Sequence, residues 1–383
     1  MVQSTRFCNI NCSYCYLPFR TDKSRFDVAL FKPLFENLKR ADLLGEQLTI
    51  LWHAGEPLAL PADYYREAFQ ALKEFCPKTV RLDHHLQTNA MLINDDHIAL
   101  FQDWNVQIGV SIDGPAWLHD QNRMTRSGKG SHAKALAGVK KLQEANIPFT
   151  CIAVLTAPAL NHADELYDFF KSLGCYNVGF NIDEEESINE TSTMRGKTIE
   201  SAYKTFLKQI YRRIRADRNP LRVREFDNVS QSIGSWFDRE APNCTESNAL
   251  SILSVDAEGN LYTFSPEFVD VVSEHYNDFK IGHVSDIVFE KLYETEPFAS
   301  LNRDIKEGIY NCKQTCGYFD TCGGGVPSNK YFELGNLAGT ETNFCRLTRK
   351  TMLDTVHEII AEAHQARRVA EWELTETAQE TSD

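Results

Sequence analysis

The stretch CNINCSYCYLPFR, residues 8–20, decides the expected fold because it places three cysteines within eight residues. Cys8, Cys12 and Cys15 have the spacing C-x3-C-x2-C and directly follow a strand-like run, VQSTRF, at residues 2–7. Three thiolates this close together can bind zinc or an iron-sulfur cluster. With only three protein ligands, a four-iron cluster keeps one iron open for a substrate or a cofactor. The spacing alone leaves a structural metal site as the alternative.

The composition limits the classes of protein that remain. The chain has 383 residues, 42% of them hydrophobic, which is enough for a sizeable core and two or three domains. It contains no long apolar run and no signal peptide, so we expect a cytoplasmic protein without a membrane partner. A net charge of -14 argues against a nucleic-acid partner. Eleven cysteines in a reducing compartment indicate metal or redox chemistry.

Short strand-like runs alternate with helical patterns over the first half of the chain. The runs lie at residues 2–7, 47–53, 80–88, 106–111, 148–155 and 176–182. Residues 62–75 and 131–146 show helical spacing between two of these pairs of runs. Such alternation is typical of parallel strands joined by helices. It predicts an α/β fold, with a partial, open (β/α)6 barrel.

The pattern changes after the sixth run, and we divide the chain into three parts. A barrel with a connector helix is expected at residues 1–235, a cysteine-rich domain at 236–346, and a helix with a disordered tail at 347–383. The connector, at residues 193–217, is a long amphipathic helix with a basic face. That face is either a solvated surface or a site for an acidic peptide.

Four further motifs follow the next strand-like runs: HAGEP (53–57), QTNA (87–90), SIDGP (111–115) and HDQNR (119–123). Together with the cysteine spacing, they resemble the radical S-adenosylmethionine (SAM) superfamily. The resemblance implies a 4Fe-4S cluster bound by the three cysteines, whose open iron binds SAM. It implies SAM contacts from these residues: Tyr14, Gly55, Glu56, Gln87, Ser111, Asp113, Arg123 and Asn181. Reductive cleavage of SAM then gives a 5′-deoxyadenosyl radical, which abstracts a hydrogen atom. Ala54 stands where the family usually has glycine, and is tolerable if the local φ allows it.

A second cysteine cluster lies in NCKQTCGYFDTCGGGVPSNK (311–330) and NFCR (343–346). This segment resembles the SPASM domain of peptide-modifying radical SAM enzymes, which typically carries two auxiliary 4Fe-4S clusters. The resemblance implies that one auxiliary cluster is fully ligated by the following four cysteines: Cys312, Cys316, Cys322 and Cys345. Zinc bound by the same four thiolates is the alternative.

The other auxiliary cluster lacks its ligands in this sequence. Phe264 and Val326 stand where the family has cysteines, and Cys244 is the single thiol left. We therefore expect two clusters in total, one for SAM and one auxiliary. Cys244 is then a remnant, a buried thiol or a substrate contact.

The segments TFSPE (263–267), CGGGVPSNK (322–330) and TETNFCR (340–346) resemble the cyclophane-forming peptide maturases of the GrrM/OscB type. The resemblance implies a ribosomally made precursor peptide as substrate, an external one-electron donor, and a C–C crosslink between an aromatic ring and the Cβ of a nearby residue. For the general base we rank Glu267 first, ahead of Asp256 and the acidic run at residues 183–186. That run is otherwise a solvated loop.

Two other functions remain open. SIDGP and HDQNR are shared with anaerobic sulfatase maturases, which generate formylglycine, although Phe264 and Val326 weaken that assignment. A non-catalytic iron-sulfur carrier is the third reading, and it predicts no consumption of SAM.

Overall fold

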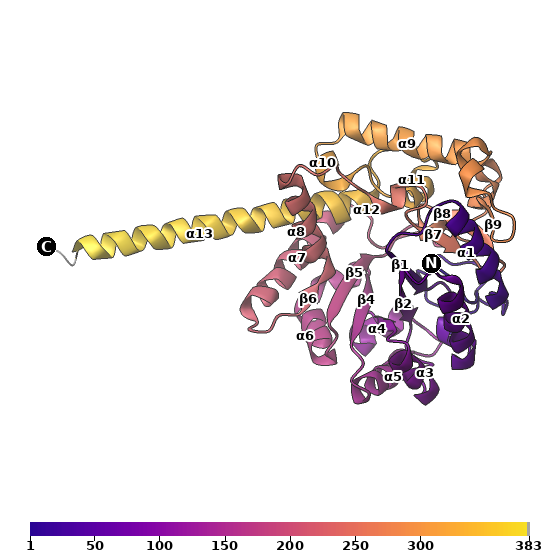
Figure 1. The fold of residues 1–383 in the computed structure, drawn as a ribbon. Helices are drawn as coiled ribbons and strands as arrows, with labels where there is room; N and C mark the ends of the chain where they lie inside the picture. Colours follow the sequence, from indigo (N-terminus) through magenta and orange to yellow (C-terminus); the bar gives the residue numbers. More distant parts are fainter. Residues whose placement is uncertain (381–383) are drawn as a thin grey trace.

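The computed structural model describes residues 1–380 and has a mixed α/β architecture (Figure 1). The strands are β1 (Gln47–Trp52), β2 (Arg81–Thr88), β3 (Gln107–Ser111), β4 (Phe149–Leu155), β5 (Asn177–Ile182), β6 (Arg222–Val223), β7 (Leu253–Val255), β8 (Asn260–Thr263) and β9 (Gly282–His283). The helices of the barrel are α1 (Phe31–Arg40), α2 (Ala62–Phe75), α3 (Asp95–Asp103), α4 (Ala116–Asn122), α5 (His132–Glu144), α6 (Ala163–Leu173), α7 (Ile199–Ala216) and α8 (Arg224–Phe237). The later helices are α9 (Phe298–Thr315), α10 (Phe319–Cys322), α11 (Pro327–Leu334), α12 (Asn343–Cys345) and α13 (Met352–Glu380).

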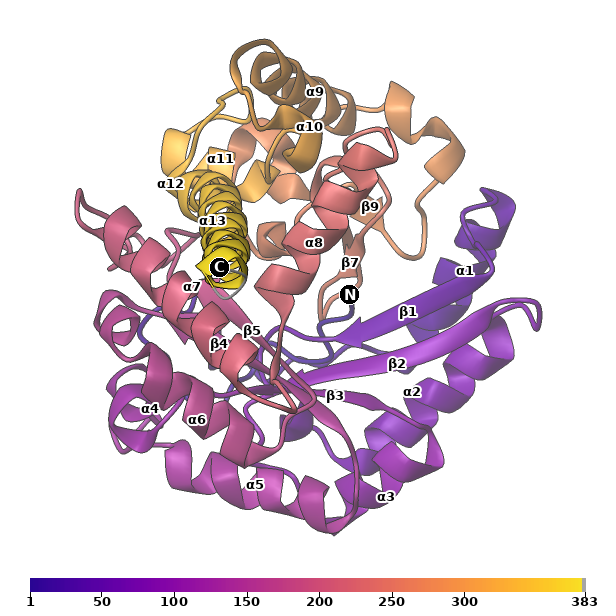
Figure 2. The same ribbon diagram turned by 90° about the vertical axis from the view of Figure 1, so that its left-hand side faces the viewer.

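The first six strands form one curved sheet in the order β1-β2-β3-β4-β5-β6, and every neighbouring pair is parallel. Figure 2 shows helices α2, α3, α5 and α6 along the outer side of this sheet, with the second domain across its other side. The partial α/β barrel predicted from the alternating pattern is therefore confirmed. Its parallel strands end at the same edge, where the loops that carry the sequence motifs meet.

The strands of this sheet differ from the expected set at both ends. VQSTRF forms only isolated bridges, in which Val2 pairs with Trp52 of β1 and also with Val255 of β7. The chain must turn at once into the cysteine loop, so the run is too short to continue as a strand. The sixth strand is instead β6, a two-residue strand that pairs with Asn177 and Val178 of β5. Neither β6 nor α8 was predicted from the sequence, and both follow the expected connector helix at residues 193–217.

The barrel core is built from the inner face of α2 against β1 and β2. Tyr65, Phe69 and other apolar residues recur at helical spacing on α2, which begins directly after Pro61. The ring of Trp52 packs edge-on against Tyr65 at 5.3 Å, and Phe69 stacks on His84 at 3.9 Å. Burial lowers the pKa of His84 to about 4, so this imidazole is neutral and belongs to the core.

The second domain begins with an antiparallel sheet in the order β7-β8-β9. Residues 1–3 connect it to the barrel, because the Val2 amide donates to Leu51 O at 2.8 Å and the Gln3 amide donates to Val255 O at 2.9 Å. Arg6 adds a second connection, with Nη2 2.7 Å from Oδ1 of Asp270. The barrel and the hairpin therefore share one hydrogen-bonded seam.

Helix α7 begins at Ile199, later than the expected start at residue 193, and ends one residue before the expected end. Part of its basic face is not a solvated surface. Lys204 and Lys208 each lie within 2.8 Å of Glu358 on α13, and Lys208 also contacts Glu362. These cations hold α13 against the barrel, which accounts for part of the basic pattern.

Helix α13 leaves the body of the molecule as a single long helix (Figure 1). It runs to Glu380, whereas the sequence analysis expected a disordered tail from about residue 371. The segment from residue 371 contains four Glu together with single Leu, Ala and Gln residues, all of which have high helix propensity, and this accounts for the longer helix. The end of the expected tail, residues 381–383, lies outside the described residues. Within residues 1–380, we find no helix both long and apolar enough to cross a membrane.

Candidate active site

The cysteine loop and the motif loops enclose a cavity of about 200 Å³ at the carboxyl edge of the sheet, which we call the barrel cavity. It is lined by most of the residues that the sequence analysis selected: Cys8, Cys12, Tyr14, Cys15, Gly55, Glu56, Gln87, Ser111, Arg123 and Asn181. Tyr16, His53, Glu184 and Glu186 also line it and were not among the predicted contacts. Motifs that are far apart in sequence therefore converge on one space.

Backbone hydrogen bonds fix the shape of the cysteine loop. The Cys8 amide donates to Arg20 O at 3.1 Å, which closes the loop at its base. The Asn11 amide donates to Met124 O at 2.7 Å, and the Ser13 amide donates to Asn122 O at 3.0 Å. These bonds attach the loop to the end of the HDQNR motif, so the thiols face the barrel cavity.

Burial sets the charge of the thiols. It raises the pKa of Cys8 to about 12, with the Glu56 carboxylate adding to the shift, and it raises the pKa of Cys12 to about 11. Both thiols are therefore neutral unless a cationic centre stabilises the thiolate form, as iron does when it is coordinated.

The HAGEP turn requires a backbone that few residues adopt. Gly55 has φ +73°, and a Cβ atom there would lie 2.3 Å from Thr5 O and 2.9 Å from Phe7 O. Ala54 also lies in the left-handed region, at φ +68°. The alanine in place of the family glycine is therefore accommodated in the left-handed conformation rather than in an ordinary one. This turn brings the backbone of HAGEP against the cysteine loop.

Glu56 holds two motif loops together. Its carboxylate accepts hydrogen bonds from Thr88 Oγ1 at 2.6 Å, from the Asn89 amide at 2.8 Å and from the Leu58 amide at 3.0 Å. Burial nonetheless raises its pKa above the usual value, since the side chain is almost fully enclosed. Asn89 in turn donates to Asn9 Oδ1 at 2.7 Å, which links QTNA to the cysteine loop.

Asp113 does not line the barrel cavity but orients two residues that do. It accepts hydrogen bonds from the Tyr14 hydroxyl and, at 2.9 Å, from Arg123 Nε. The Arg123 guanidinium also lies 5.5 Å from the centre of the Tyr14 ring. His119, which like Arg123 belongs to HDQNR, accepts a hydrogen bond at Nδ1 from the Asp113 amide at 3.3 Å. SIDGP and HDQNR thus form one buried network behind the cysteine loop.

Gln87 and Ser111 meet inside the barrel. Gln87 Nε2 donates to Ser111 Oγ at 2.8 Å. Gly109 makes room for this pair, because a Cβ atom there would lie 2.0 Å from Gln87 Oε1. The amide and the hydroxyl are therefore held in place as hydrogen-bonding groups on the wall of the barrel cavity.

The second cysteine cluster also surrounds a single space, of about 220 Å³, which we call the four-thiol cavity. All four predicted ligands line it: Cys312, Cys316, Cys322 and Cys345. Lys330 Nζ lies 3.5 Å from Cys312 Sγ. Burial raises the pKa of the Cys345 thiol to about 12, so the thiolate form again needs a cationic partner.

The cysteine ligands and the volumes of the barrel cavity and the four-thiol cavity fit metal clusters better than single metal ions. In residues 1–380, no three His, Cys, Asp or Glu side chains converge closely enough to hold a single metal ion. The two cysteine-lined cavities have about 200 and about 220 Å³, whereas one water-sized sphere occupies only about 10–15 Å³. Thiolates around a larger space are the ligand arrangement that an iron-sulfur cluster requires, because each binds its own iron.

The residues that replace the other expected ligands are buried hydrocarbon side chains. Phe264 is fully buried, and its ring stacks on Phe298 at 6.1 Å. Val326 is also buried. Cys244 donates to Gly325 O at 3.4 Å, and burial raises its pKa to about 11, so it is a neutral, hydrogen-bonded thiol.

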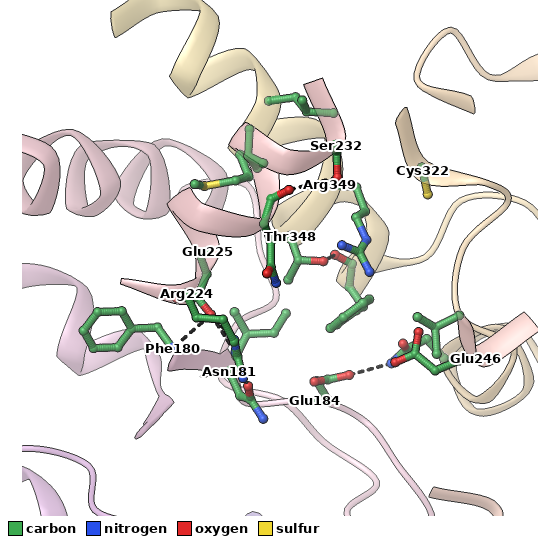
Figure 3. A pocket seen from close by; sticks show the side chains of 18 of the residues that line it. Phe180, Asn181, Glu184, Arg224, Glu225, Ser232, Glu246, Cys322, Thr348 and Arg349 are labelled. Atoms are coloured by element: carbon green, nitrogen blue, oxygen red, sulfur yellow. Dashed lines mark hydrogen bonds and ion pairs between the residues drawn. The ribbon is translucent and has the colours of Figure 1, made fainter. Parts of the chain in front are cut away.

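A third cavity, of about 350 Å³, lies between the barrel and the second domain, and we call it the interdomain cavity (Figure 3). Asn181, Ile182, Glu184 and Glu186 line both this cavity and the barrel cavity. Cys322 lines both this cavity and the four-thiol cavity. The interdomain cavity therefore lies between the two cysteine clusters.

The acidic run after β5, residues 183–186, is not a solvated loop, so that interpretation of the sequence is wrong. Asp183 is buried and accepts hydrogen bonds from the Thr193 amide at 2.7 Å and from Thr193 Oγ1 at 2.9 Å. These two hydrogen bonds turn the next residues inward. Glu184 and Glu186 therefore face the interdomain cavity and the barrel cavity. The sequence signal was the position of the run directly after a barrel strand, where the chain of this fold presents functional side chains.

The two other candidate bases lie in different surroundings. Glu267, on the turn after β8, lines the interdomain cavity but not the barrel cavity. Burial raises its pKa to about 7. Asp256 is fully buried in the hairpin, where Asn260 Nδ2 and Tyr262 Oη donate to it at 2.8 and 3.0 Å. Asp256 is therefore a structural carboxylate of the second domain.

Comparisons with known sequences agree with this geometry. The radical SAM superfamily matches residues 2–170. The uncharacterized protein sll1766 of Synechocystis sp. is 36% identical over 361 residues, which cover 93% of this chain and 90% of the relative. The cysteine-type anaerobic sulfatase-maturating enzyme of Clostridium novyi is 26% identical over 353 residues, covering 88% of this chain and 89% of the relative.

Two solved structures share the whole fold. The enzyme anSMEcpe, with bound AdoMet and the Kp18Cys peptide, superposes with a TM-score of 0.76 at 16% identity, covering 95% of this chain and 98% of its own. SuiB of Streptococcus suis, bound to the precursor peptide SuiA, superposes with a TM-score of 0.62 at 15% identity, covering 90% of this chain and 75% of its own. At such low identity these matches establish the fold only. The cysteine loop, the motifs around the barrel cavity and the sequence match together show that the chain is an enzyme of the radical SAM superfamily.

Proposed function

We propose that this enzyme modifies a ribosomally made precursor peptide by forming a C–C crosslink between an aromatic ring and the Cβ of a nearby residue, a cyclophane. The observation that carries the proposal is the position of the interdomain cavity, which shares Glu184 and Glu186 with the barrel cavity and Cys322 with the four-thiol cavity. A peptide in this space would lie between two sites of redox chemistry. Such a position suits an oxidation that removes two electrons in separate steps.

The residues around the barrel cavity fit a 4Fe-4S cluster and SAM. Cys8, Cys12 and Cys15 would hold the cluster, and the Gly55 backbone with the Gln87 and Ser111 side chains supplies polar groups for SAM. When bound and reduced, these groups supply a 5′-deoxyadenosyl radical that abstracts a hydrogen atom from the substrate. The four-thiol cavity would hold the auxiliary cluster, with Lys330 beside Cys312. SAM, the two clusters and an external one-electron donor are therefore part of the proposal.

The protein's own carboxylates supply proton acceptors for restoring the aromatic ring. Glu267 is our first candidate, since burial raises its pKa to about 7 and a carboxylate with such a pKa accepts a proton efficiently near neutral pH. Glu184 and Glu186 line the same cavity and are alternative acceptors. The Tyr16 hydroxyl lies close to all three carboxylates. Burial raises its pKa, and the charges of the three carboxylates raise it further.

Two of the neighbours support a peptide as the substrate. SuiB is bound to a precursor peptide, and anSMEcpe is bound to the Kp18Cys peptide. The second candidate function, generation of formylglycine in a sulfatase, is favoured by the sequence match to the sulfatase-maturating enzyme of Clostridium novyi. Phe264 and Val326, which are buried hydrocarbon side chains at two expected ligand positions, favour the crosslinking enzyme.

Mass spectrometry distinguishes these functions. The enzyme is expressed anaerobically with the small open reading frame next to its gene, and the peptide is isolated. A mass loss of two hydrogens, with a C–C bond located by fragmentation, supports the cyclophane. An aldehyde at a Cys or Ser supports the sulfatase maturase. Reduced, reconstituted protein that releases no 5′-deoxyadenosine would support the iron-sulfur carrier and refute both enzymes.

A further inference from the structure

The interdomain cavity gathers four carboxyl side chains that form no ion pair with a basic residue of residues 1–380. Glu184, Glu186, Glu246 and Glu267 all line it. They come from separate segments of the chain, two from the loop after β5, one from the short helix before β7 and one from the turn after β8. None of the ion pairs formed by residues 1–380 includes any of the four. Half-buried carboxylates in this number, without a cation, are unusual because burial of charge is costly.

The basic residues of the cavity do not change this balance. Arg224 lines the wall but already pairs with Glu225, at 2.6 Å, and donates to Asn181. Arg349 reaches the same space, where Figure 3 shows it with Glu184 and Glu246 around the open volume. Its Nε has no hydrogen-bond partner among residues 1–380. One uncommitted guanidinium therefore faces four carboxylates.

A separate observation points to a missing ligand. The Ser328 side chain is fully buried and lines the cavity, yet its Oγ has no hydrogen-bond partner in the described chain. Next to it, Asn329 is buried and donates to Glu184 Oε2 at 2.6 Å. Buried hydroxyl groups are nearly always paired, so an unpaired one on a cavity wall indicates a polar group that binds there.

The charges favour a cation, and the space favours an organic one. The cavity of about 350 Å³ is much larger than a metal ion needs. Among the described residues, no three carboxylates lie close enough together to bind a single metal ion. A guanidinium presents five N–H donors in a planar fork that matches carboxylates, and an ammonium presents three donors. A backbone carbonyl or a hydroxyl of the same ligand can pair with Ser328.

We infer that the interdomain cavity binds a basic side chain, Arg or Lys, of the substrate peptide, through Glu184, Glu186 and Glu267. The inference rests on the proposed peptide substrate. Since Glu184 and Glu186 also line the barrel cavity, the basic residue lies beside the residue that is modified. These carboxylates are then specificity-determining residues, which the sequence analysis considered only as candidate bases.

The protonation of the carboxylates agrees with this inference. Burial raises the pKa of Glu184 to about 8, with Glu267, Glu333 and Glu246 adding to the shift and Asn329 opposing it. Burial and the same carboxylates raise the pKa of Glu186. The other titratable groups that line the cavity are Arg224, Glu225, Cys322 and Arg349, and Tyr16 of the cysteine loop lies beside the carboxylates. The empty cluster holds protons at neutral pH, and an arriving cation is expected to displace them.

The test is isothermal titration of the anaerobically reconstituted enzyme, with SAM present, against N-acetyl-arginine amide and its neutral isostere N-acetyl-citrulline amide. We expect the arginine probe to bind at least roughly 10-fold more tightly, because only the charged guanidinium forms charge-assisted hydrogen bonds with the carboxylates. Titration in two buffers with different ionisation enthalpies should show proton release on binding. N-acetyl-lysine amide tests whether an ammonium serves as well.

Variants locate the site. Glu184→Gln and Glu186→Gln should each weaken binding of the arginine probe and reduce the proton release. Glu190→Gln is the matched control, because Glu190 lies on the same loop, is exposed and does not line the cavity. Equal binding of the arginine and citrulline probes, equal effects of Glu184→Gln and Glu190→Gln, or no binding of the arginine probe at millimolar concentration would overturn the inference.

The result is separable from the proposed function. If the arginine probe binds as expected but the modified peptide contains no C–C crosslink, the proposed function fails and the basic-residue site remains. If a crosslinked peptide forms and replacing each of its Arg and Lys residues with Gln leaves KM unchanged, the inference fails and the proposed function remains. Binding of Mg²⁺ in place of the arginine probe, with the same loss in Glu184→Gln, would likewise refute the organic cation.

Discussion

Asn329 of α11 donates a hydrogen bond to Glu184 at 2.6 Å, and so a residue of the second domain holds a carboxylate of the barrel in place. Arg195 strengthens the same boundary, since it lies 2.6 Å from Glu185 and 3.2 Å from Glu333 of α11. The geometry of the interdomain cavity therefore depends on both domains. Substitutions on α11 should affect the chemistry of the barrel without touching a cysteine.

Glu184 should make the stability of the protein depend on pH. Its folded-state pKa of about 8 exceeds the unfolded value near 4.5, so between these values the folded chain binds a proton that the unfolded chain has released. The free energy of unfolding should fall as the pH rises through this window. Glu184→Gln should flatten that slope, as measured by anaerobic urea denaturation at several pH values. A slope as steep as in the wild type, or one flattened equally by Glu190→Gln, would refute the assignment.

The first cysteine cluster should be separable from the second. Cys12→Ala should remove about four of the roughly eight irons and abolish the release of 5′-deoxyadenosine, because the barrel cavity loses a ligand. Iron content and chromatography of the nucleoside products measure both effects. Cys76→Ala is the control, since Cys76 is a buried thiol that lines neither cysteine cavity. Full iron content in Cys12→Ala would contradict the ligand assignment.

The second cysteine cluster should be needed for the product but not for the radical. Cys345→Ser removes one of the four thiols of the four-thiol cavity and should lower the iron content by about four while SAM cleavage persists. Crosslinked peptide should be lost. Cys244→Ala should leave the iron content unchanged, because Cys244 already donates its proton to Gly325. If the four thiolates bind zinc instead, Cys345→Ser should lower the zinc content of the protein and leave its iron content unchanged.

Gly55 should tolerate no side chain. A Cβ atom would lie 2.3 Å from Thr5 O and 2.9 Å from Phe7 O, and backbone atoms cannot rotate away as the end of a flexible side chain can. Gly55→Ala should lower the free energy of unfolding by about 2 to 3 kcal/mol and weaken SAM binding. The adjacent Ala54→Gly should change stability by less than about 1 kcal/mol, since glycine accepts φ +68°. Urea denaturation and equilibrium dialysis of SAM measure the contrast.

Arg6 should contribute more to stability than an ordinary ion pair. Its guanidinium contacts Asp270 at 2.7 Å, and the Asp270 side chain is only 3% exposed. Arg6→Ala leaves that carboxylate buried without a cation, with Gln3 Nε2 at 3.3 Å as its remaining side-chain donor, which costs about 3 to 5 kcal/mol. The control is Arg40→Ala, whose partner Glu290 is largely exposed, with an expected loss below about 1 kcal/mol. Similar losses in both variants, by urea denaturation, would show that Arg6 is not a buried connection.

The sequence was informative where short motifs define the local backbone. The cysteine spacing and the turns of HAGEP and SIDGP need particular residues at fixed positions, so their convergence at the end of a parallel sheet followed from the barrel fold. The four-thiol cavity was predicted for the same reason. The replacement of thiols by Phe264 and Val326 was visible in the sequence, but the packing of Phe264 in the core and the position of Val326 on the wall of the interdomain cavity were not.

The sequence was less informative where contacts are distant and side chains are ordinary. β6 has two residues, too few for any periodicity, and is formed because it pairs with β5. The inward direction of Glu184 depends on the hydrogen bonds of Asp183 to Thr193 and on Asn329, about 145 residues later. Acidic residues in a loop are usually solvated, so the position of the run directly after β5 was the one signal that these residues line a cavity.

The double pairing of Val2 has a consequence for how the chain folds. Val2 bridges Trp52, about 50 residues later, and Val255, about 250 residues later. A growing chain therefore makes the cysteine loop first but can complete the seam beside it only after the hairpin has been synthesised. Until then, the segment before the three cysteines is bridged to β1 but not to the second domain. Assembly of the iron-sulfur cluster is thus expected to follow synthesis of the second domain, although its three ligands precede that domain in the sequence.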